Sequence, residues 1–420
     1  MNIIKNKHVF MDAYSSIKNH IRKTPLEFNE RLSAKYGCKL YIKREDLQLC
    51  RSFKIRGALH KMVNLEDSHK NKGIVCASAG NHAQGVALSS NKFNINTDIF
   101  VPSTTPLQKI NQIRNHSNPY ICRLHITGTS FNECLEESLE FTQKKSKTFI
   151  HPYNDPQVIL GQSTIAHEIY SDLYEIDSTP DYMISGIGGG GLISGLSQYT
   201  KAFGNCIHIG VEPESCPSMK ESVRNNELLT IIPKDSFVDG ATVSRVGDLT
   251  FPICKKNVQQ YYDVSLGKIC ETMIELYQED GIISEPAGAL SLSVLDQLDS
   301  HEIKDKTVVC ILSGGNNDIT RYPEILDRSL RYQGKKIYYI VQFIQRPGEL
   351  KTFVNDIVSP GDDIVRFEYI KKTNKDFGNV LVGVELENPS NKYKVESNLM
   401  KHGFHYIEIN ENDQLYSYLV

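Results

Sequence analysis

The feature that constrains this chain most is a run of four consecutive glycines, Gly188–Gly191. An apolar stretch that reads as a buried strand, Tyr182–Ser185, leads into the run, and Leu192 opens a segment with helical periodicity. Consecutive glycines are costly in conformational entropy, so they make sense where bare backbone N–H groups must approach a ligand closely. Because a helix N-terminus adds unpaired N–H donors and a favourable dipole, the segment predicts a phosphate-binding loop.

The composition indicates an ordinary globular chain rather than a fibre, a disordered tail or a small disulfide scaffold. Its 420 residues are 40% hydrophobic and 23% charged, which suits two or three domains with large cores. The formal net charge of −3 leaves no electrostatic footprint for nucleic acid. No apolar run approaches the ~18 residues of a membrane helix. We therefore expect neither nucleic acid nor a membrane as a partner.

The cysteines and the first residues bear on location in the cell. The ten cysteines form no C-x-x-C pair, so zinc-ribbon and thioredoxin motifs are absent and no metal is predicted. Lys5 and Lys7 interrupt the apolar residues near the start, so that segment lacks the apolar core of a signal peptide. These features predict buried, reduced thiols in a cytoplasmic protein.

Most of the chain alternates short apolar runs with longer segments of helical periodicity. This alternation is typical of an α/β fold with largely parallel sheets, because each parallel connection needs a crossover helix. The runs that we predict as buried strands are Lys39–Ile42, Gly73–Cys76, Thr97–Val101, Tyr182–Ser185, Ile207–Val211 and Thr307–Leu312.

The pattern changes near residue 335, where a second type of domain begins. The elements expected here follow the order β-α-β-β-α-β, the ferredoxin-like arrangement of an α+β domain. They are the strand Lys336–Phe343, the helix Glu349–Val358, the strands Arg366–Ile370 and Val380–Glu387, the helix Ser390–His402 and the strand Phe404–Ile409. A charged segment, Tyr322–Lys335, precedes them. We predict a two-lobed core over residues 1–325, a linker over 326–335 and a small domain over 336–420.

The glycine loop also satisfies the dinucleotide-binding pattern G-x-G-x-x-G, at Gly186, Gly188 and Gly191. Glu212 follows at the end of the next predicted strand, where such folds place an acidic partner for the ribose. On this motif alone an NAD-dependent dehydrogenase is an alternative. Other segments of the chain must decide whether the loop binds a dinucleotide or another phosphate ligand.

A lysine between apolar residues, Lys54, is the candidate nucleophile. It lies in Ser52–Ala58 (SFKIRGA), flanked by Phe53 and Ile55 and followed by a helical pattern. A lysine in apolar surroundings loses proton affinity and can become a nucleophilic amine. A phosphate site together with such an amine suggests pyridoxal 5′-phosphate, whose aldehyde forms a Schiff base with lysine.

Two further polar segments follow predicted strands. Ser78–Gly85 (SAGNHAQG) opens a helix, whose N-terminus can hold a substrate carboxylate. Within it, Asn81 suits the phenolic oxygen of the cofactor, whereas His82 is at least as well explained by packing as by base catalysis. In the last segment, Ser313–Asn317, Ser313 either hydrogen-bonds a ring nitrogen or caps a turn.

Together these segments resemble the fold-type II pyridoxal-phosphate enzymes, and among them the threonine dehydratases (threonine ammonia-lyases). The matching segments are Thr24–Leu26, Lys43–Asp46, Ser52–Ala58, Ser78–Gly85, His151–Ile169, Gly188–Leu192, Gly210–Ser215, Glu285–Gly288 and Ser313–Asn316. The resemblance implies a catalytic core of two α/β lobes followed by an ACT-like domain.

The resemblance also implies roles for particular residues. Lys54 would be the catalytic, Schiff-base lysine, and Phe53 would pack near the cofactor ring. Asn81 would face the phenolic oxygen and Ser313 the pyridine nitrogen. The cofactor phosphate would be held by Gly188, Gly189, Gly190, Gly191 and Leu192. The substrate carboxylate would lie on the loop of Ser78, Ala79, Gly80, Asn81 and His82.

The implied reaction is the conversion of L-threonine to 2-oxobutanoate and ammonia, the first step of isoleucine biosynthesis. The C-terminal domain, with Phe343–Leu350 (FIQRPGEL), resembles the ACT-like regulatory domain of biosynthetic threonine dehydratases. This resemblance implies feedback inhibition by isoleucine, or an effect of valine, and a homo-oligomer, namely a tetramer. The alternative for this domain is an oligomerisation module that binds no ligand.

Some departures from the family pattern bear on the reaction. Ala79 stands where related serine racemases carry a serine as second base, which favours elimination over racemisation. Asn154 and Ser163 replace an acid and a glycine common in the family, and neither is an expected ligand. A serine-preferring dehydratase, threonine synthase or cysteine synthase stays open. The dehydrogenase is a remote alternative, because it leaves Lys54 and Ser313 without a role.

Overall fold

The computed structural model describes residues 7–370, 375–410 and 413–419. The chain divides into two units, Met1–Ile319 and Thr320–Val420, each with its own apolar core. The first unit holds two sheets and the second holds one. The domain boundaries at residues 325 and 336 stay a prediction.

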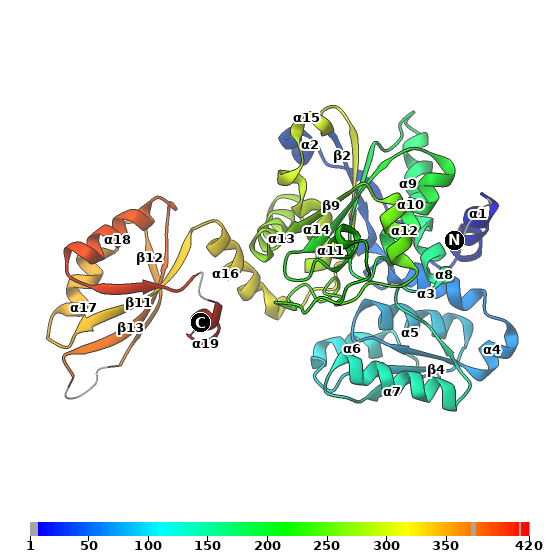
Figure 1. Ribbon diagram of the computed structural model, residues 1–420, viewed down its shortest axis with the longest axis horizontal. Helices are drawn as coiled ribbons and strands as arrows, with labels where there is room; N and C mark the ends of the chain where they lie inside the picture. The colour runs from blue at the N-terminus through cyan, green and yellow to red at the C-terminus, as the bar shows by residue number, and fades with distance from the viewer. Residues whose placement is uncertain (1–6, 371–374, 411–412, 420) are drawn as a thin grey trace. The chain divides into compact units, whose positions relative to one another are not determined.

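A six-stranded sheet forms the centre of the first unit, in the order β1-β2-β10-β7-β8-β9 (Figure 1). Its strands are β1 (Leu26–Phe28), β2 (Lys39–Arg44), β7 (Tyr182–Gly186), β8 (Ile207–Pro213), β9 (Gln260–Val264) and β10 (Thr307–Leu312). All neighbours pair in parallel except β1, which pairs antiparallel with β2 at the edge. Every residue of β10 is buried, as expected of a central strand in a covered parallel sheet.

Helices connect these strands and cover the sheet. One apolar cluster joins β7 and β10 to α1 (His8–Ile17), α8 (Pro156–Gln162), α9 (Thr164–Tyr174) and α10 (Gly191–Phe203). β7, β8 and β10 also contact α14 (Pro286–Ser293), which packs against α13 (Leu266–Asp280). The remaining helices of this lobe are α2 (Glu30–Tyr36), α11 (Ser218–Asn225), α12 (Thr250–Asn257) and α15 (Ser300–Ile303). Helix α3 (Lys54–Val63) packs against α8 and against α5 (Asn81–Phe93) of the smaller lobe.

The second sheet of this unit forms a smaller lobe, in the order β5-β4-β3-β6, with all strands parallel. Its strands are β3 (Ile74–Ala77), β4 (Thr97–Val101), β5 (Cys122–Ile126) and β6 (Thr148–Phe149). Its helices are α4 (Asp67–Lys72), α5 (Asn81–Phe93), α6 (Leu107–Asn115) and α7 (Phe131–Lys144), at the lower right of Figure 1. Ile74 and Cys76 pack in one cluster with α5, whereas Val75 and Ala77 pack with Cys134 of α7. Alternate residues of β3 therefore serve opposite faces.

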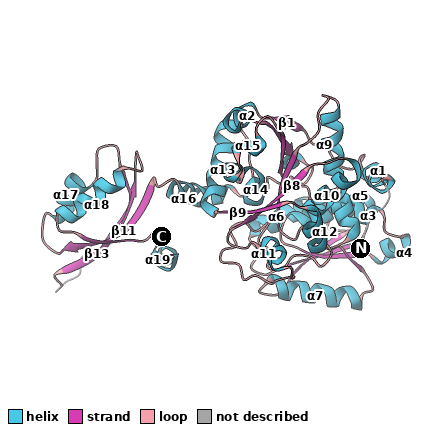
Figure 2. Ribbon diagram, turned by 45° about the horizontal axis from the view of Figure 1, so that its top comes forward, coloured by secondary structure: helices cyan, strands magenta, loops and turns pink. Residues whose placement is uncertain are grey.

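The second unit contains an antiparallel sheet in the order β12-β13-β11-β14. Figure 2 draws its strands in magenta and labels β11 and β13. Its strands are β11 (Lys336–Ile344), β12 (Asp363–Tyr369), β13 (Phe377–Glu385) and β14 (His405–Glu408). Its helices are α16 (Tyr322–Tyr332), α17 (Glu349–Thr352), α18 (Asn391–Lys401) and α19 (Asp413–Leu419). Phe343, Phe353 and Phe404 meet in its core. The predicted β-α-β-β-α-β order is confirmed.

Every strand of the first unit that the sequence did not predict lies at a sheet edge: β1, β5, β6 and β9. Edge strands have one neighbour and are less buried, so their apolar pattern is weaker. The predicted helix Glu349–Val358 is α17 followed by a π-helical turn, Phe353–Ile357. The charged segment predicted as a linker contains α16, whose first turn holds a proline. Helix α19 was not predicted.

A partly buried carboxylate, Asp327 of α16, ties that helix to the sheet and to α19. Its two oxygens accept from Tyr338 Oη at 2.8 Å, Tyr416 Oη at 2.5 Å, Lys336 Nζ at 2.8 Å and Arg331 Nε at 3.0 Å. Burial alone would raise the pKa of Asp327, but these donors outweigh burial and hold the pKa below its ordinary value. The charged form of Asp327 is therefore the one that stabilises the fold.

We expect Asp327→Asn to destabilise the second unit by about 1–3 kcal/mol, because an amide leaves donors unsatisfied and removes a paired charge. Since the folded pKa of Asp327 is depressed, this contribution is present above its unfolded pKa and is lost as pH falls through the folded pKa. Urea unfolding of the full chain at neutral and acid pH measures both effects. The control is Glu324→Gln on the same helix, where an exposed pair with Arg328 is expected to contribute at most about 1 kcal/mol. Equal stability of the two variants would contradict the assignment.

Candidate active site

A pocket opens where β7 and β10 end, the position at which open α/β sheets bind ligands. The strand β7 leads into the glycine loop, α3 begins at Lys54, and Ser313 follows β10 directly. The residues lining this pocket are Phe53, Lys54, Pro152, Tyr153, Gly186, Gly188, Gly189, Gly190, Gly191, Leu192, Gly240, Ala241, Ala287, Leu290 and Ser313. Segments far apart in the sequence thus meet at one site.

The glycine loop has no room for side chains. A Cβ on Gly189 would lie 2.3 Å from the ring of Tyr153, and one on Gly191 would lie 2.9 Å from Tyr153 Cβ. Gly190, the N-cap of α10, has a φ of +88°, which glycine adopts without strain. Its Cβ would also lie 2.7 Å from Met219. The bare backbone therefore faces the pocket at the start of α10, as a phosphate site requires.

Thr250 holds this loop in place. Its hydroxyl donates to the carbonyl of Gly189 at 2.6 Å, and it accepts from the backbone N–H of Gly247 at 3.0 Å. Thr250 is fully buried, so the loop is fixed from behind by a satisfied hydroxyl.

Lys54 is the first residue of α3, and its amine points into the pocket. Nζ donates to the carbonyl of Pro152 at 3.1 Å and lies 5.3 Å from the centre of the Phe53 ring. Burial lowers the pKa of Lys54 to about 8, although the charge of Glu285 acts in the opposite direction. An amine with such a pKa exchanges a proton near neutral pH, as a catalytic base must.

The predicted loop Ser78–His82 begins α5 but does not line the pocket. Asn81 is anchored at both ends of its amide, by Glu285 and Asn316. His82 is 2% exposed, and its Nε2 bonds with the carbonyl of Ile150 at 2.8 Å. Burial lowers the pKa of His82 to about 3. The His82 ring is therefore a neutral packing group.

Sequence reasoning did not assign several residues that line the pocket. Pro152 and Tyr153 belong to the segment His151–Ile169, which resembles the family pattern, but the sequence did not indicate that they line the pocket. Ala287 follows Glu285 in another matched segment, and Gly240 lies in an irregular stretch that carried no signal. These residues enter the site only through the fold.

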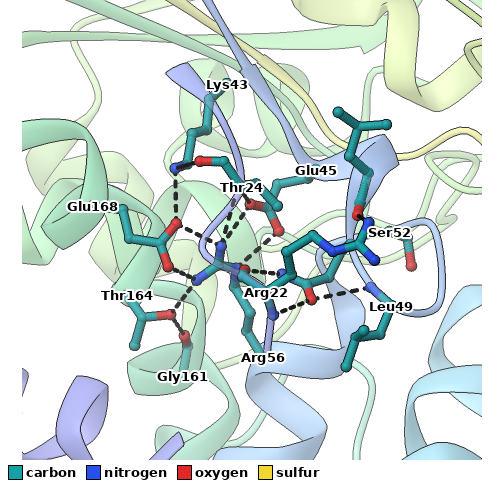
Figure 3. Close-up of polar contacts among 12 residues, drawn as sticks. Arg22, Thr24, Lys43, Glu45, Leu49, Ser52, Arg56, Gly161, Thr164 and Glu168 are labelled. Atoms are coloured by element: carbon teal, nitrogen blue, oxygen red, sulfur yellow. Dashed lines mark hydrogen bonds and ion pairs between the residues drawn. The ribbon is translucent and has the colours of Figure 1, made fainter. Parts of the chain in front are cut away.

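A buried network of charges supports the lysine-bearing helix (Figure 3). Arg56, two residues after Lys54, donates to both oxygens of Glu45 at 2.7–2.8 Å and to both oxygens of Glu168 at 2.8 Å. Lys43 of β2 donates to Glu168 at 2.7 Å. All four side chains are at most 1% exposed. Two cations and two carboxylates thus balance one another and join α3, β2 and α9.

Charge pairing outweighs burial at Glu168 and Arg56, whereas burial outweighs pairing at Lys43 and lowers the pKa of its amine. Burial would raise the pKa of Glu168, but Arg56 and Lys43 lower it overall. Burial would lower the pKa of Arg56, yet Glu45 and Glu168 raise it. Thr24 adds a hydroxyl that donates to Glu45, and Thr164 accepts from Arg56 at 3.2 Å.

The pocket fits pyridoxal phosphate by its chemistry. It offers backbone N–H groups at a helix N-terminus for a phosphate, an amine for an aldehyde, and the Ser313 hydroxyl, which donates only weakly to Ala287 O at 3.3 Å. Leu192, Ala287 and Leu290 supply apolar walls for a ring. Residues 17–314 match the family of pyridoxal-phosphate dependent enzymes, and the chain belongs to this family. The cofactor is therefore pyridoxal 5′-phosphate.

Comparisons narrow the class further. Residues 327–419 match the C-terminal regulatory domain of threonine dehydratase. The chain is 47% identical over 411 residues, 97% of each chain, to the biosynthetic L-threonine dehydratase IlvA of Staphylococcus aureus. A similar IlvA from Staphylococcus epidermidis is 46% identical over 97% of each chain. The chain thus resembles biosynthetic threonine dehydratases along its whole length.

Solved structures with a similar fold include a threonine deaminase and a serine racemase. The processed form of threonine deaminase isoform 2 from Solanum lycopersicum is 34% identical, with a TM-score of 0.72 over 77% of this chain and 87% of that chain. The serine racemase of Dictyostelium discoideum is 29% identical, with a TM-score of 0.69 over 75% of this chain and 99% of that chain.

The dehydrogenase alternative is wrong. The oxygens of Glu212 accept from the backbone N–H groups of Met219 and Lys220 at 2.8 Å and 2.7 Å, so this buried carboxyl caps α11. Burial raises the pKa of Glu212 to about 8. A neutral, enclosed carboxyl is unsuited to a ribose, and the family of the chain excludes this reading.

Two further observations concern the cysteines and the length of the helices. All ten cysteines are buried free thiols. Among residues 7–370, 375–410 and 413–419, no helix is long and apolar enough to cross a membrane.

We expect Arg56→Ala to destabilise the first unit by about 3–5 kcal/mol, because it leaves Glu45 and Glu168 as buried, unpaired charges. Turnover should fall as well, since Arg56 anchors the first turn of α3. Urea unfolding followed by circular dichroism measures the first effect. Arg224→Ala is the control: the Arg224 side chain is 77% exposed, and the expected change is at most about 1 kcal/mol. An Arg56→Ala protein as stable as this control would contradict the role of the network.

Proposed function

We propose that this chain dehydrates and deaminates L-threonine to 2-oxobutanoate and ammonia, as a biosynthetic threonine ammonia-lyase. The observation that carries this proposal is the 47% identity to biosynthetic L-threonine dehydratases over 97% of both chains. The match of residues 327–419 to the regulatory domain of threonine dehydratase supports it independently. The reaction would supply isoleucine biosynthesis.

The pocket residues divide the work of holding the cofactor. The N–H groups of Gly188–Gly191 and Leu192 would bind the phosphate at the start of α10. Phe53 and Leu192 would pack against the ring, Ser313 would meet the pyridine nitrogen, and Asn81 the phenolic oxygen. When bound, pyridoxal phosphate supplies an electron sink for the negative charge that forms at the substrate α-carbon.

Lys54 would move the proton at the substrate α-carbon. Its amine has a pKa of about 8, and the carbonyl of Pro152 orients it from 3.1 Å. The loop Ser78–His82 would bind the substrate carboxylate through its backbone N–H groups. Ala79 has no proton to exchange, so this position offers no second base, which favours elimination over racemisation.

Lys54→Ala should abolish the visible absorbance of the bound cofactor and reduce 2-oxobutanoate formation to background, because no other amine lines the pocket among the described residues. The assay follows 2-oxo acid from threonine and from serine. Lys92→Ala, at the end of α5, is a control for a lysine outside the pocket and should behave as the unchanged chain. Retained activity of Lys54→Ala would refute the assignment.

The second unit would bind an amino-acid effector. We propose isoleucine as feedback inhibitor, with valine as the competing effector, and a homotetramer as the assembly. We further propose residues 1–325 as the catalytic domain, 326–335 as a linker and 336–420 as the ACT-like regulatory domain. Buried thiols in every cysteine support a cytoplasmic location.

Isoleucine should lower the rate of the full-length chain at subsaturating threonine, because an effector bound to one state of the regulatory domain shifts the population of the enzyme. Titration with isoleucine and with valine in the 2-oxo acid assay measures this effect, and leucine serves as the control ligand. A rate unchanged by both isoleucine and valine would contradict the regulatory proposal and leave the catalytic one intact.

A further inference from the structure

Glu285 is a buried carboxyl, two residues before the pocket residue Ala287, to which neither the sequence motifs nor the mechanism gives a role. It is the N-cap residue of α14, but its side chain does not cap that helix. It is 8% exposed. A buried acid without a charged partner in direct contact is costly unless it serves a purpose.

The carboxyl touches two segments that would hold the cofactor. Oε1 accepts from Asn81 Nδ2 at 2.7 Å, and Asn81 Oδ1 accepts from Asn316 Nδ2 at 2.7 Å. Both ends of the Asn81 amide are therefore assigned, and Nδ2 keeps one further N–H. The backbone N–H of Glu285 donates to the carbonyl of Gly314 at 3.1 Å.

The Glu285 carboxyl packs closely against the backbone of Gly314. A Cβ on Gly314 would lie 2.3 Å from Glu285 Oε1, so glycine is the residue that lets this carboxyl reach Asn81. Since Gly314 follows Ser313 directly, Glu285 connects the loop expected at the pyridine nitrogen with the residue expected at the phenolic oxygen.

The charged groups that act on Glu285 are Asp239, Lys109 and Lys54. Burial is the main cause that raises the pKa of Glu285 to about 7, with Asp239 adding to it, while Asn81, Lys109 and Lys54 oppose the rise. Lys109 forms an ion pair with Asp239. Lys54, in contrast, hydrogen-bonds only a neutral group among the described residues, the carbonyl of Pro152. In return, Glu285 raises the pKa of Lys54.

We propose that Glu285 is a positioning residue of this active site: it fixes the direction of the Asn81 amide and couples its own charge to the protonation of Lys54. The proposal rests on the function proposed above, in which Lys54 and Asn81 meet the cofactor. Glutamine in this place would still accept from Asn81 but would carry no charge. A charged carboxylate favours the ammonium form of Lys54, and its protonation near pH 7 releases that bias.

The direct test titrates Lys54 in the full-length apoenzyme. The protein is pulse-methylated reductively at a series of pH values, and mass spectrometry quantifies the Lys54 peptide. The midpoint for Lys54 should lie near pH 8 in the unchanged chain. In Glu285→Gln it should move down by roughly one pH unit, because the charge that stabilises the ammonium form is gone.

Two further variants make the test specific. Asn81→Ala removes a donor that lowers the pKa of Glu285, so it should also move the Lys54 midpoint down, by less than Glu285→Gln does. This variant tests the coupling even when Glu285→Gln does not fold. Glu214→Gln removes one exposed carboxylate and should leave the midpoint unchanged.

Activity of the loaded enzyme provides the second readout. In Glu285→Gln the acid limb of the pH profile of kcat/KM should move to lower pH, as the Lys54 midpoint does. In Glu214→Gln this limb should stay at the pH of the unchanged chain. A Lys54 midpoint that is unchanged in both Glu285→Gln and Asn81→Ala would overturn the proposal. Failure of the unchanged chain to convert threonine would instead refute the proposed function, since the apoenzyme titration requires no substrate.

Discussion

The pairing of Arg56 with Glu45 and Glu168 is the interaction on which the catalytic unit depends. Arg56 lies two residues after Lys54, so the position of the reactive amine follows from the position of this guanidinium. The network joins α3 to β2 and to α9, which come from separate parts of the chain (Figure 3). With one partner missing, a buried charge would remain without compensation, so all members must be present together. This mutual requirement gives α3 a single place in the fold.

The glycine loop meets a different constraint, that of space. Tyr153 lies against Gly189 and Gly191, and Met219 and Thr250 lie against Gly190, so a side chain at these positions would displace its neighbours. The same crowding leaves the backbone N–H groups as the surface that a ligand meets. Lys54 stands opposite, held by Pro152 on the connection from the small lobe to α8. The site therefore combines one rigid loop with one amine whose pKa is lowered by burial.

Site residues that stand in a continuous sequence motif could be predicted, whereas residues brought in by long-range packing could not. Gly188–Gly191 and Lys54 stand in motifs that are read along the chain, and Ser313 ends a buried strand, so all three were predicted and meet in one pocket. Tyr153 and Ala287 line the same pocket through long-range packing, which leaves no periodic signal. For His82 the sequence left packing and base catalysis open, and the structure turns its ring to a backbone carbonyl. The edge strands escaped prediction because partial burial weakens the alternation of apolar and polar residues.

The sequence by itself determined the two kinds of fold in the chain and pointed to the glycine run and to Lys54 as candidate site residues, because glycine runs, strand periodicity and flanking apolar residues act over short distances. Only the tertiary structure decided which groups surround that lysine. Glu285 is 231 positions from Lys54 in the chain and acts on its proton only because β10, α14 and α5 converge. It also decided that Glu212 caps α11 rather than binding a ribose. Burial and charge coupling depend on distances in space, and a linear pattern does not contain them.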